Sequence, residues 1–206
     1  PGVLSGSGGF TKYGDGTLIL SGSTANSYDG DTYVDNGTLL LRKTSGSAVP
    51  HGSLTIGTGA GSANEVIVLE EVNYQIGDSV AVTIHADGWL NVDSYTDTVG
   101  PITFNGGHAG SSTGLLRLGG TVTVNSSSSE ALLDGKVYLG AGTRSFSVAE
   151  GSVGYELRVT AVLSGNALLK AGRASWQAAR HTRTSSTVMP GLLCSPCLPW
   201  AGIASL

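Results

Sequence analysis

The chain has 206 residues, of which 32 are glycine, 40% are hydrophobic and only 13% are charged. This apolar content is too high for a disordered Gly/Ser linker. The net charge of −4 comes from an acidic body, residues 1–172, which carries all 15 acidic and 8 basic residues, and from residues 173–206, which carry three arginines and no acid. The body offers no basic face to neutralise phosphates, which argues against nucleic-acid binding, and it contains no cysteine, so it does not depend on disulfides.

Short runs of alternating apolar and polar residues follow one another along the body, a pattern typical of half-buried strands. The runs begin at Leu18, Leu39, Leu54, Val80, Leu90, Ile102, Leu116, Val122, Val137, Phe146 and Leu157. Turn signals separate them: Asp35-Asn36-Gly37, Gly57-Thr58-Gly59, Asp87-Gly88, Gly106-Gly107, Gly119-Gly120, Asp134-Gly135 and Gly140-Ala141-Gly142. No stretch of ten residues before residue 173 shows helical periodicity.

Many short strands at a spacing near ten residues fit a sandwich, a barrel or a solenoid. The sequence pattern that begins at Ser5 recurs at Leu163–Gly172, and such internal repetition favours the solenoid. The expected inward residues are uniformly Leu, Val and Ile, as stacked coils require. The sequence therefore predicts an all-β chain that forms a right-handed parallel β-solenoid of seven or eight coils.

Residues 5–41 also resemble a known family. They contain Lys12, Gly16-Thr17-Leu18, Tyr28, Thr32 and Gly37-Thr38-Leu39 at the spacings of the autotransporter-associated β-strand repeat of large bacterial surface and secreted proteins. Phe10 stands where that family usually has Leu. The resemblance extends more loosely over residues 1–172, with a second copy beginning at 163–172.

The resemblance implies a β-helical passenger segment that is exported to the bacterial cell surface, and it supplies no catalytic residues. We expect the chain to be part of a longer protein, because it begins in the middle of the pattern. Its expected partners are neighbouring repeats of the same chain and, in adhesion, surface glycans or host and matrix ligands. No cofactor, metal or transmembrane segment is expected in this stretch.

The pattern breaks at residue 173. Residues 173–206 hold both cysteines and only 2 of the 32 glycines. Read from the third base of each codon, Met189-Pro190 must encode Ala and Trp200-Ala201 must encode Gly, which are residues that the repeat uses. We therefore expect residues 173–206 to be an irregular, out-of-frame tail; a genuine variable tail is the alternative.

Several groups of residues are candidates for chemical sites. Cys194 and Cys197 form a CxxC pair, but no second pair accompanies it, so zinc or redox chemistry is not expected. Alternate carboxylates such as Asp29, Asp31 and Asp35 can bind calcium, although solvated turn acids are the simpler interpretation. The acids Glu65, Glu70 and Glu71 are expected to keep a sheet edge soluble.

An enzymatic alternative needs carboxylates that converge on one face. The densest set is Asp87, Asp93 and Asp97 with His85, whereas His51, His85 and His108 are far apart and need no special role. Because acids cluster by chance, a non-catalytic stalk or display scaffold is the preferred function. The alternatives are a polysaccharide-degrading β-helix and a carbohydrate-binding surface that uses Tyr13, Tyr28, Tyr33 and Tyr95.

Overall fold

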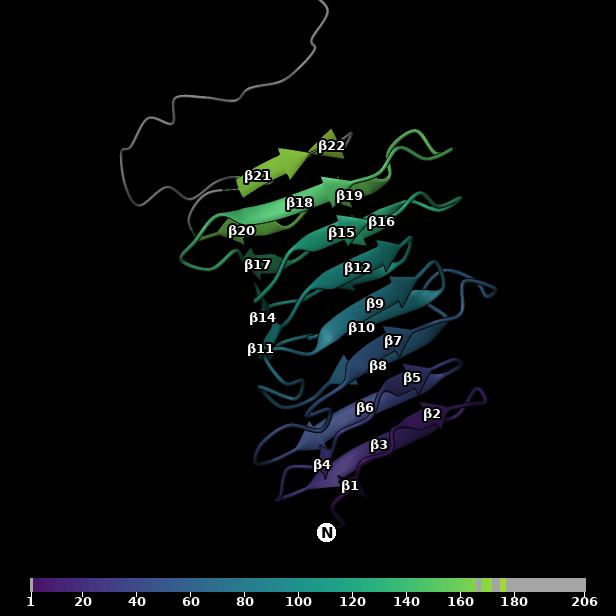
Figure 1. Ribbon diagram of the computed structural model, residues 1–206, viewed down its shortest axis with the longest axis vertical. Coiled ribbons are helices and arrows are strands. Elements are labelled where there is room, and N and C mark those ends of the chain that lie inside the picture. The colour runs from purple at the N-terminus through teal and green to yellow at the C-terminus, as the bar shows by residue number, and fades with distance from the viewer. Residues whose placement is uncertain (1, 166–167, 172–174, 177–206) are drawn as a thin grey trace, which may run out of the picture.

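The computed structural model describes residues 2–165, 168–171 and 175–176, with side chains through residue 165. These residues form an all-β chain without helices, in which parallel strands stack as a solenoid of about 7 turns (Figure 1). The prediction of a parallel β-solenoid is confirmed. Successive coils rise from the N-terminal end in chain order, so each coil contacts chiefly the coils before and after it.

Two long sheets form two walls of the solenoid, each with eight strands in parallel register. Sheet 1 consists of β2 (Phe10–Lys12), β5 (Thr32–Val34), β7 (Ser53–Ile56), β9 (Ala81–His85), β12 (Ile102–Asn105), β15 (Val122–Val124), β18 (Arg144–Val148) and β21 (Leu168–Ala171). Sheet 2 consists of β3 (Thr17–Gly22), β6 (Thr38–Lys43), β8 (Val66–Glu70), β10 (Gly88–Asn91), β13 (His108–Gly110), β16 (Ala131–Leu133), β19 (Leu157–Val159) and β22 (Ser175–Trp176).

The third wall is regular only in its later coils. There β11 (Thr96–Val99), β14 (Leu115–Leu118), β17 (Lys136–Tyr138) and β20 (Val162–Ser164) form sheet 3. The earlier coils contribute the short pair β1 (Ser5–Gly6) and β4 (Ser27–Tyr28), and a single bridge between Val49 and Ile76. The third wall therefore changes from loops to a sheet along the solenoid axis.

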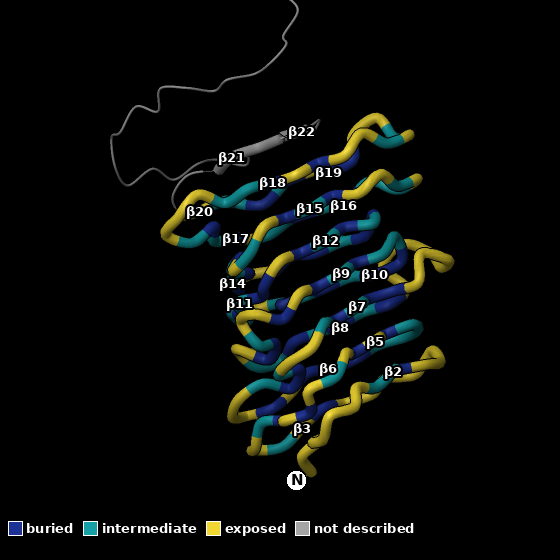
Figure 2. The backbone as a smooth tube through the Cα atoms, in the orientation of Figure 1, coloured by how far each residue is buried: buried dark blue, intermediate teal, exposed yellow. Residues whose placement is uncertain are grey.

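Register places like residues above one another. In sheet 1 the inward row Leu54–Val82–Ile102–Val122–Phe146 is almost completely buried. On the outward face of the same strands, four threonines stand above one another: Thr55, Thr83, Thr103 and Thr123. β-branched residues pack well on such a pleated surface. In Figure 2 the buried stretches follow the strands, and the exposed ones gather at the corners and ends.

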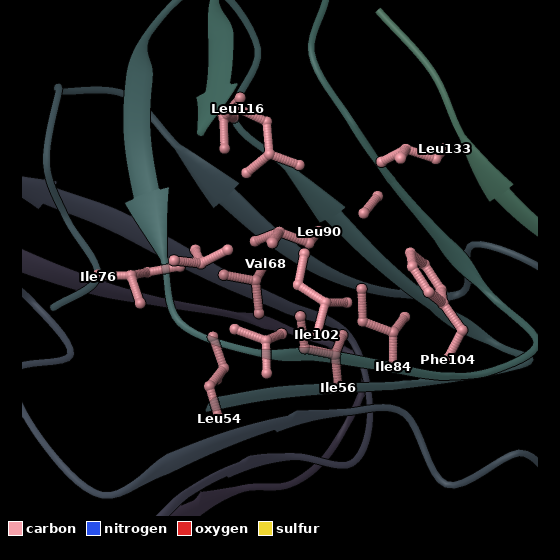
Figure 3. Close-up of a cluster of buried hydrophobic side chains, with 14 of the residues drawn as sticks. Leu54, Ile56, Val68, Ile76, Ile84, Leu90, Ile102, Phe104, Leu116 and Leu133 are labelled. Carbon is pink, nitrogen blue, oxygen red and sulfur yellow. The ribbon is translucent and has the colours of Figure 1, made fainter. Parts of the chain in front are cut away.

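The core is one continuous aliphatic column that runs between the walls. Figure 3 shows side chains from several coils meeting there, among them Leu54, Ile84, Leu90 and Leu116. Phe104 and Phe146 lie fully buried in this column. At the N-terminal end Leu18 and Ile19 on β3 are 38% and 48% exposed, because no preceding coil covers them in the described chain.

A pair of glycines makes one of the sharp corners between sheets 1 and 2. Gly106 and Gly107 have φ values of +82° and +78°, a region that side chains disfavour. A Cβ on Gly107 would lie 2.1 Å from the carbonyl oxygen of His85 in the coil below. This corner therefore requires glycine for both conformation and space.

The end of the chain is described only in part. β21 continues sheet 1, and β22, which lies beyond residue 172, pairs with β19 through Arg158↔Ser175 and Val159↔Trp176. The expectation that nothing after residue 172 extends the solenoid is therefore not met at these two residues. The remaining tail, including Cys194 and Cys197, lies outside the described residues, and the frameshift hypothesis stays a prediction.

Candidate functional site

The repeat segment near the N-terminus uses its lysine to hold a corner together. Lys12 is only 6% exposed, and its Nζ donates to the carbonyl oxygens of Tyr13 (3.2 Å), Gly14 and Asn36 (2.8 Å). The Asn36 contact reaches into the next coil. Because the ammonium satisfies carbonyls that the turn leaves without strand partners, Lys12 stabilises the stacking of the first two coils.

A second contact of the repeat involves Tyr28. Its hydroxyl lies 2.7 Å from Thr32 Oγ1, its ring meets Phe10 edge-on at 5.6 Å, and the residue is 3% exposed. Burial raises the pKa of Tyr28, an effect that the bond to Thr32 partly offsets. The expectation that Tyr28 forms an exposed stacking platform is therefore wrong. Tyr13 and Tyr33 are exposed, whereas Tyr95 is half-buried.

Asp87 fastens a long corner loop to the coil above it. Its carboxylate accepts hydrogen bonds from the backbone N–H groups of Gly59 (2.8 Å), Gly61 (3.1 Å) and Thr58 (3.2 Å). Burial raises the pKa of Asp87, but these donors lower it more, so the pKa lies below its ordinary value. A carboxylate held in this way orders the loop and has its acceptor sites occupied.

The acids proposed for catalysis do not converge. Asp87 lies at the corner between sheets 1 and 2, Asp93 lies at the corner between sheet 2 and the third wall, and Asp97 lies within β11 of the third wall. Asp93 accepts a 2.6 Å bond from the Ser112 hydroxyl, and Asp97 is buried. His85 is half-buried at the end of β9. The structure therefore does not assemble this set into one site.

The three acids weighed for calcium are also separated. Asp29 precedes β5 and Asp35 follows it, so they lie toward opposite ends of that strand. Asp31 accepts hydrogen bonds from the Ser53 hydroxyl (2.9 Å) and the Ser53 N–H (2.8 Å) in the next coil, and these bonds lower its pKa. No group of three or more His, Cys, Asp or Glu side chains is placed to hold a metal ion in the part of the chain that the structure describes.

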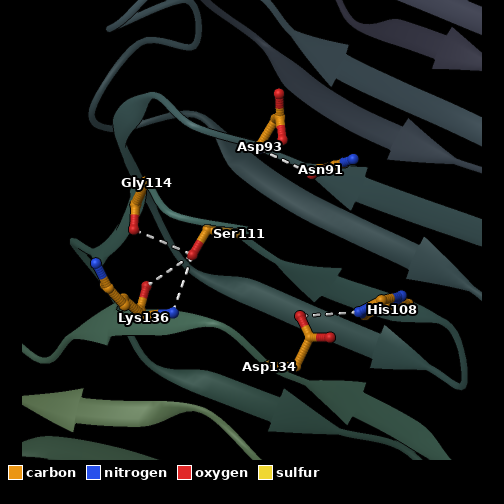
Figure 4. A network of polar contacts seen from close by, with 7 residues as sticks. All are labelled: Asn91, Asp93, His108, Ser111, Gly114, Asp134 and Lys136. Carbon is orange, nitrogen blue, oxygen red and sulfur yellow. Dashed lines mark hydrogen bonds and ion pairs between the residues drawn. The ribbon is translucent and has the colours of Figure 1, made fainter.

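Polar side chains make contacts along sheet 2 and at its corner with the third wall, among them His108 with Asp134 and Ser111 with Lys136 (Figure 4). His108 Nε2 lies 3.1 Å from Asp134 Oδ1, an ion-pair distance without hydrogen-bond alignment, and the His108 ring stacks on Trp89 at 5.1 Å. At the adjoining corner the Ser111 hydroxyl accepts from Lys136 N (2.9 Å) and donates to Gly114 O (3.2 Å). The contacts of His108 with Trp89 and Asp134, and of Ser111 with Lys136, join successive coils, whereas the bond from Ser111 to Gly114 lies within one coil.

The sequence interpretation missed a buried polar group on the third wall. Asn26 accepts from Leu4 N and donates to Ala48 O, and Gln75 exchanges bonds with Lys43 N and O at 2.7 and 3.0 Å. These side chains are buried; Asn26 bonds backbone groups of loops, and Gln75 bonds the backbone at the end of β6. Asn and Gln suit this task because each amide is both donor and acceptor.

The burial of Glu70 contradicts the expectation drawn from the sequence. Glu70 was expected to keep a sheet edge soluble together with Glu65 and Glu71, and it is instead 0% exposed. Glu65 is exposed, and its carboxylate accepts a 2.6 Å bond from Ser62 N. Glu71 forms an outer ion pair with Arg42. Only Glu70 turns into the core.

These contacts show what the residues of the repeat segment do: Lys12, Tyr28 and Thr32 each hold neighbouring parts of the first two coils in place. Residues 10–41 match the family described as the passenger-associated-transport-repeat. This similarity covers 32 of the 206 residues. The resemblance drawn from residues 5–41 is thus confirmed, with the match beginning at residue 10.

Similarity to known proteins was found in this family match. No curated protein and no solved structure matches the chain. Among the described residues there is also no helix of the length and apolarity that crossing a membrane requires.

Proposed function

We propose that this chain is a non-catalytic structural segment of an exported bacterial surface protein, in which it serves as an elongated β-helical stalk or display scaffold. The observation that carries the proposal is the unbroken parallel register of eight strands in each of two sheets. Every coil buries the inward residues of its neighbours, so the assembly is a rod whose length follows from the number of coils.

The signature residues of the passenger-associated transport repeat support this role. Lys12 and Tyr28 are both buried, and their polar atoms bond within the first two coils. Side chains used in this way stabilise stacking and are not available to a substrate. The name of the family associates such repeats with transported passengers, which supports export to the cell surface.

The positions of the acids favour a segment without an active site. Asp87 is saturated by loop N–H groups, and Asp93 is bonded to Ser112. A glycosidase needs two carboxyl groups within about 5–10 Å of each other and open to a sugar. The carboxylates named above lie at different corners or inside the core, which is the arrangement expected of a scaffold.

Surface display can be tested with an epitope tag inserted after Gly142 in the parent protein. This residue lies in the exposed turn between β17 and β18, and no atom lies within 4 Å of where its Cβ would be. We expect an antibody to label intact cells. Labelling only after the cells are permeabilised would contradict export, and the same tag on a cytoplasmic protein provides the control.

Glycan binding is a second candidate, favoured by two exposed tyrosines near the N-terminal end. Tyr13 is 73% and Tyr33 40% exposed, and Thr11, the register partner of Tyr33, is two residues from Tyr13. Exposed rings can supply contact area at low entropic cost. A glycan array should then lose signal with the Tyr13→Ala, Tyr33→Ala double variant but not with Tyr155→Ala, which alters an exposed tyrosine far along the chain.

A further inference from the structure

Glu70 occupies a position in the core that its neighbours fill with aliphatic side chains. It is the register partner of Leu41, which pairs in turn with Leu20. Val92 follows Asn91, the partner of Leu69, so Val92 stands beside Glu70 in the next coil. Leu41, Glu70 and Val92 are all 0% exposed. A carboxyl group therefore interrupts an inward row of Leu and Val.

Asp97 interrupts the corresponding row of the third wall. It is the register partner of Leu116, which pairs with Val137, and Val137 pairs with Leu163. Asp97 is also 0% exposed. Glu70 and Asp97 thus approach each other from the two walls that meet at this corner, and the charge of Asp97 acts on Glu70.

The two carboxyl groups have unequal surroundings. Asp97 Oδ2 accepts from Gln75 N (2.7 Å) and Ile76 N (2.9 Å), and Oδ1 accepts from Thr98 N (2.6 Å). Three N–H donors favour an ionised carboxylate. Neither carboxyl oxygen of Glu70 accepts a hydrogen bond from a donor among the described residues. An ionised Glu70 would thus be a buried charge without compensation, which is very unfavourable.

Two cations lie on the neighbouring strand β6, and both are directed elsewhere. Lys43 on β6 is 2% exposed, but its Nζ donates to Gly2 O at 3.0 Å, toward the N-terminal end. Gln75, the other polar side chain at the corner, is uncharged, and Arg42 pairs with Glu71 on the outer side. Among the described residues the charged group that faces Glu70 is therefore Asp97.

We propose that Glu70 and Asp97 share one proton inside the solenoid, and that this proton is a pH-sensitive latch that holds the loop at residues 71–80 against the third wall. The neutral carboxyl of Glu70 donates to the carboxylate of Asp97, which in turn holds the N–H groups of Gln75 and Ile76. When the proton leaves to solvent, two adjacent buried carboxylates repel each other, and the loop loses its anchor.

The direction of the pH effect follows from the shift of Glu70. Burial, and secondly the charge of Asp97, raise the pKa of Glu70 well above 4.5, and burial raises the pKa of Asp97 to about 6. A group with a raised folded-state pKa contributes stability that is fully present below its unfolded pKa and is lost as the pH rises through its folded pKa. The latch is therefore closed while Glu70 keeps its proton, and it opens as the pH rises through the folded-state pKa of Glu70.

The first test measures the proton directly in the unmodified full-length chain. Glutamate labelled with ¹³C at the carboxyl carbon should show one side-chain resonance that still has the shift of a protonated acid at pH 6, when exposed glutamates are ionised. This resonance should be missing from Glu70→Gln. If every glutamate resonance titrates in the ordinary range, Glu70 carries no such proton and the proposal fails, whether or not any variant folds.

The second test measures the consequence for the loop. Amide hydrogen exchange at Gln75 and Ile76, corrected for the intrinsic effect of pH, should accelerate about tenfold for each unit by which the pH exceeds the pKa of Glu70. Glu70→Gln, which keeps a donor to Asp97 and cannot ionise, should remove this dependence, whereas Glu71→Gln should keep it. Equal pH dependence in all three chains, or protection that requires added Ca²⁺ or Mg²⁺, would overturn the proposal.

Discussion

The carboxylate of Asp87 accepts a 2.8 Å hydrogen bond from the backbone N–H of Gly59, a residue 28 positions earlier and one coil below. The same carboxylate also accepts from Thr58 and Gly61. One side chain thus orders a corner loop that has no strand partners of its own. The bond from Ser62 N to the Glu65 carboxylate adds a second contact within the loop.

Replacing Asp87 with Asn should destabilise the chain by about 1–3 kcal/mol at neutral pH, because a charged acceptor of several N–H groups becomes a neutral amide with one acceptor atom. In urea unfolding the midpoint should fall, while Asp78→Asn, at an exposed position, should leave it unchanged. Equal midpoints for the two variants would mean that the loop does not depend on Asp87.

The same residue predicts a loss of stability in acid. The folded-state pKa of Asp87 is lowered, so its contribution is present above its unfolded pKa near 3.8 and disappears as the pH falls through the folded value. The difference in midpoint between the original chain and Asp87→Asn should therefore shrink when unfolding is repeated below pH 3. A difference that stays constant with pH would contradict this assignment.

The alternation in β9 predicts opposite effects at adjacent positions. Val82 is 1% exposed, and Val82→Asp should cost more than about 4 kcal/mol because a carboxylate would be buried without a partner. Thr83 points outward, so Thr83→Asp should cost less than about 1 kcal/mol. Thermal unfolding followed by circular dichroism would separate the two, and similar losses would show that the inward face is wrongly assigned.

The corner at Gly107 should not tolerate a side chain. Gly107→Ala combines a φ of +78° with a Cβ placed 2.1 Å from the His85 carbonyl oxygen, and strain of this kind costs about 1–3 kcal/mol or more. Gly142→Ala is the matched control, because its Cβ would meet nothing within 4 Å. Comparable stability of the two variants would show that the corner can relax.

The origin of residues 173–206 can be decided from the coding DNA. If the tail is out of frame, translation from the third base of each codon should give sequences such as Gly-Thr-Leu and Asn-Ala-Gly after residue 172. Stop codons or unrelated text in that frame would show that the tail is genuine. Truncation after Gly172 should then be compared with the full chain by thermal unfolding, where an out-of-frame tail should shift the midpoint by only a degree or two.

The strand pattern could be predicted because the period of two is set by backbone geometry, as Val82 and Thr83 illustrate. The same geometry also predicts that Glu70 points inward, because Glu70 continues the alternation of Val66 and Val68, the buried positions of β8. The interpretation failed there because charged residues are rarely buried, and this prior outweighed the phase of the alternation. Asp97 likewise continues the inward phase of Val99.

Other features could not be found in the sequence alone. That Asn26 and Gln75 bond the backbone depends on which loops and strand ends lie beside them, which period-two reasoning does not reveal. The burial of Tyr28 depends on Phe10 and Thr32 closing around it. Such contacts join residues whose separation is set by corner lengths, and those lengths vary between coils.

Leu20 pairs with Leu41, and a core made of such like residues does not by itself specify which coil stacks on which. Glu70, the next residue in this row, makes the stacking order specific. Coils with interchangeable leucines can slip past one another by one whole coil and still bury the same kind of surface. Displacing the stack at Glu70 would leave its carboxyl group in the core without Asp97 beside it. A polar layer inside an otherwise uniform core thus distinguishes one stacking order from its neighbours, as single buried polar residues do in coiled coils.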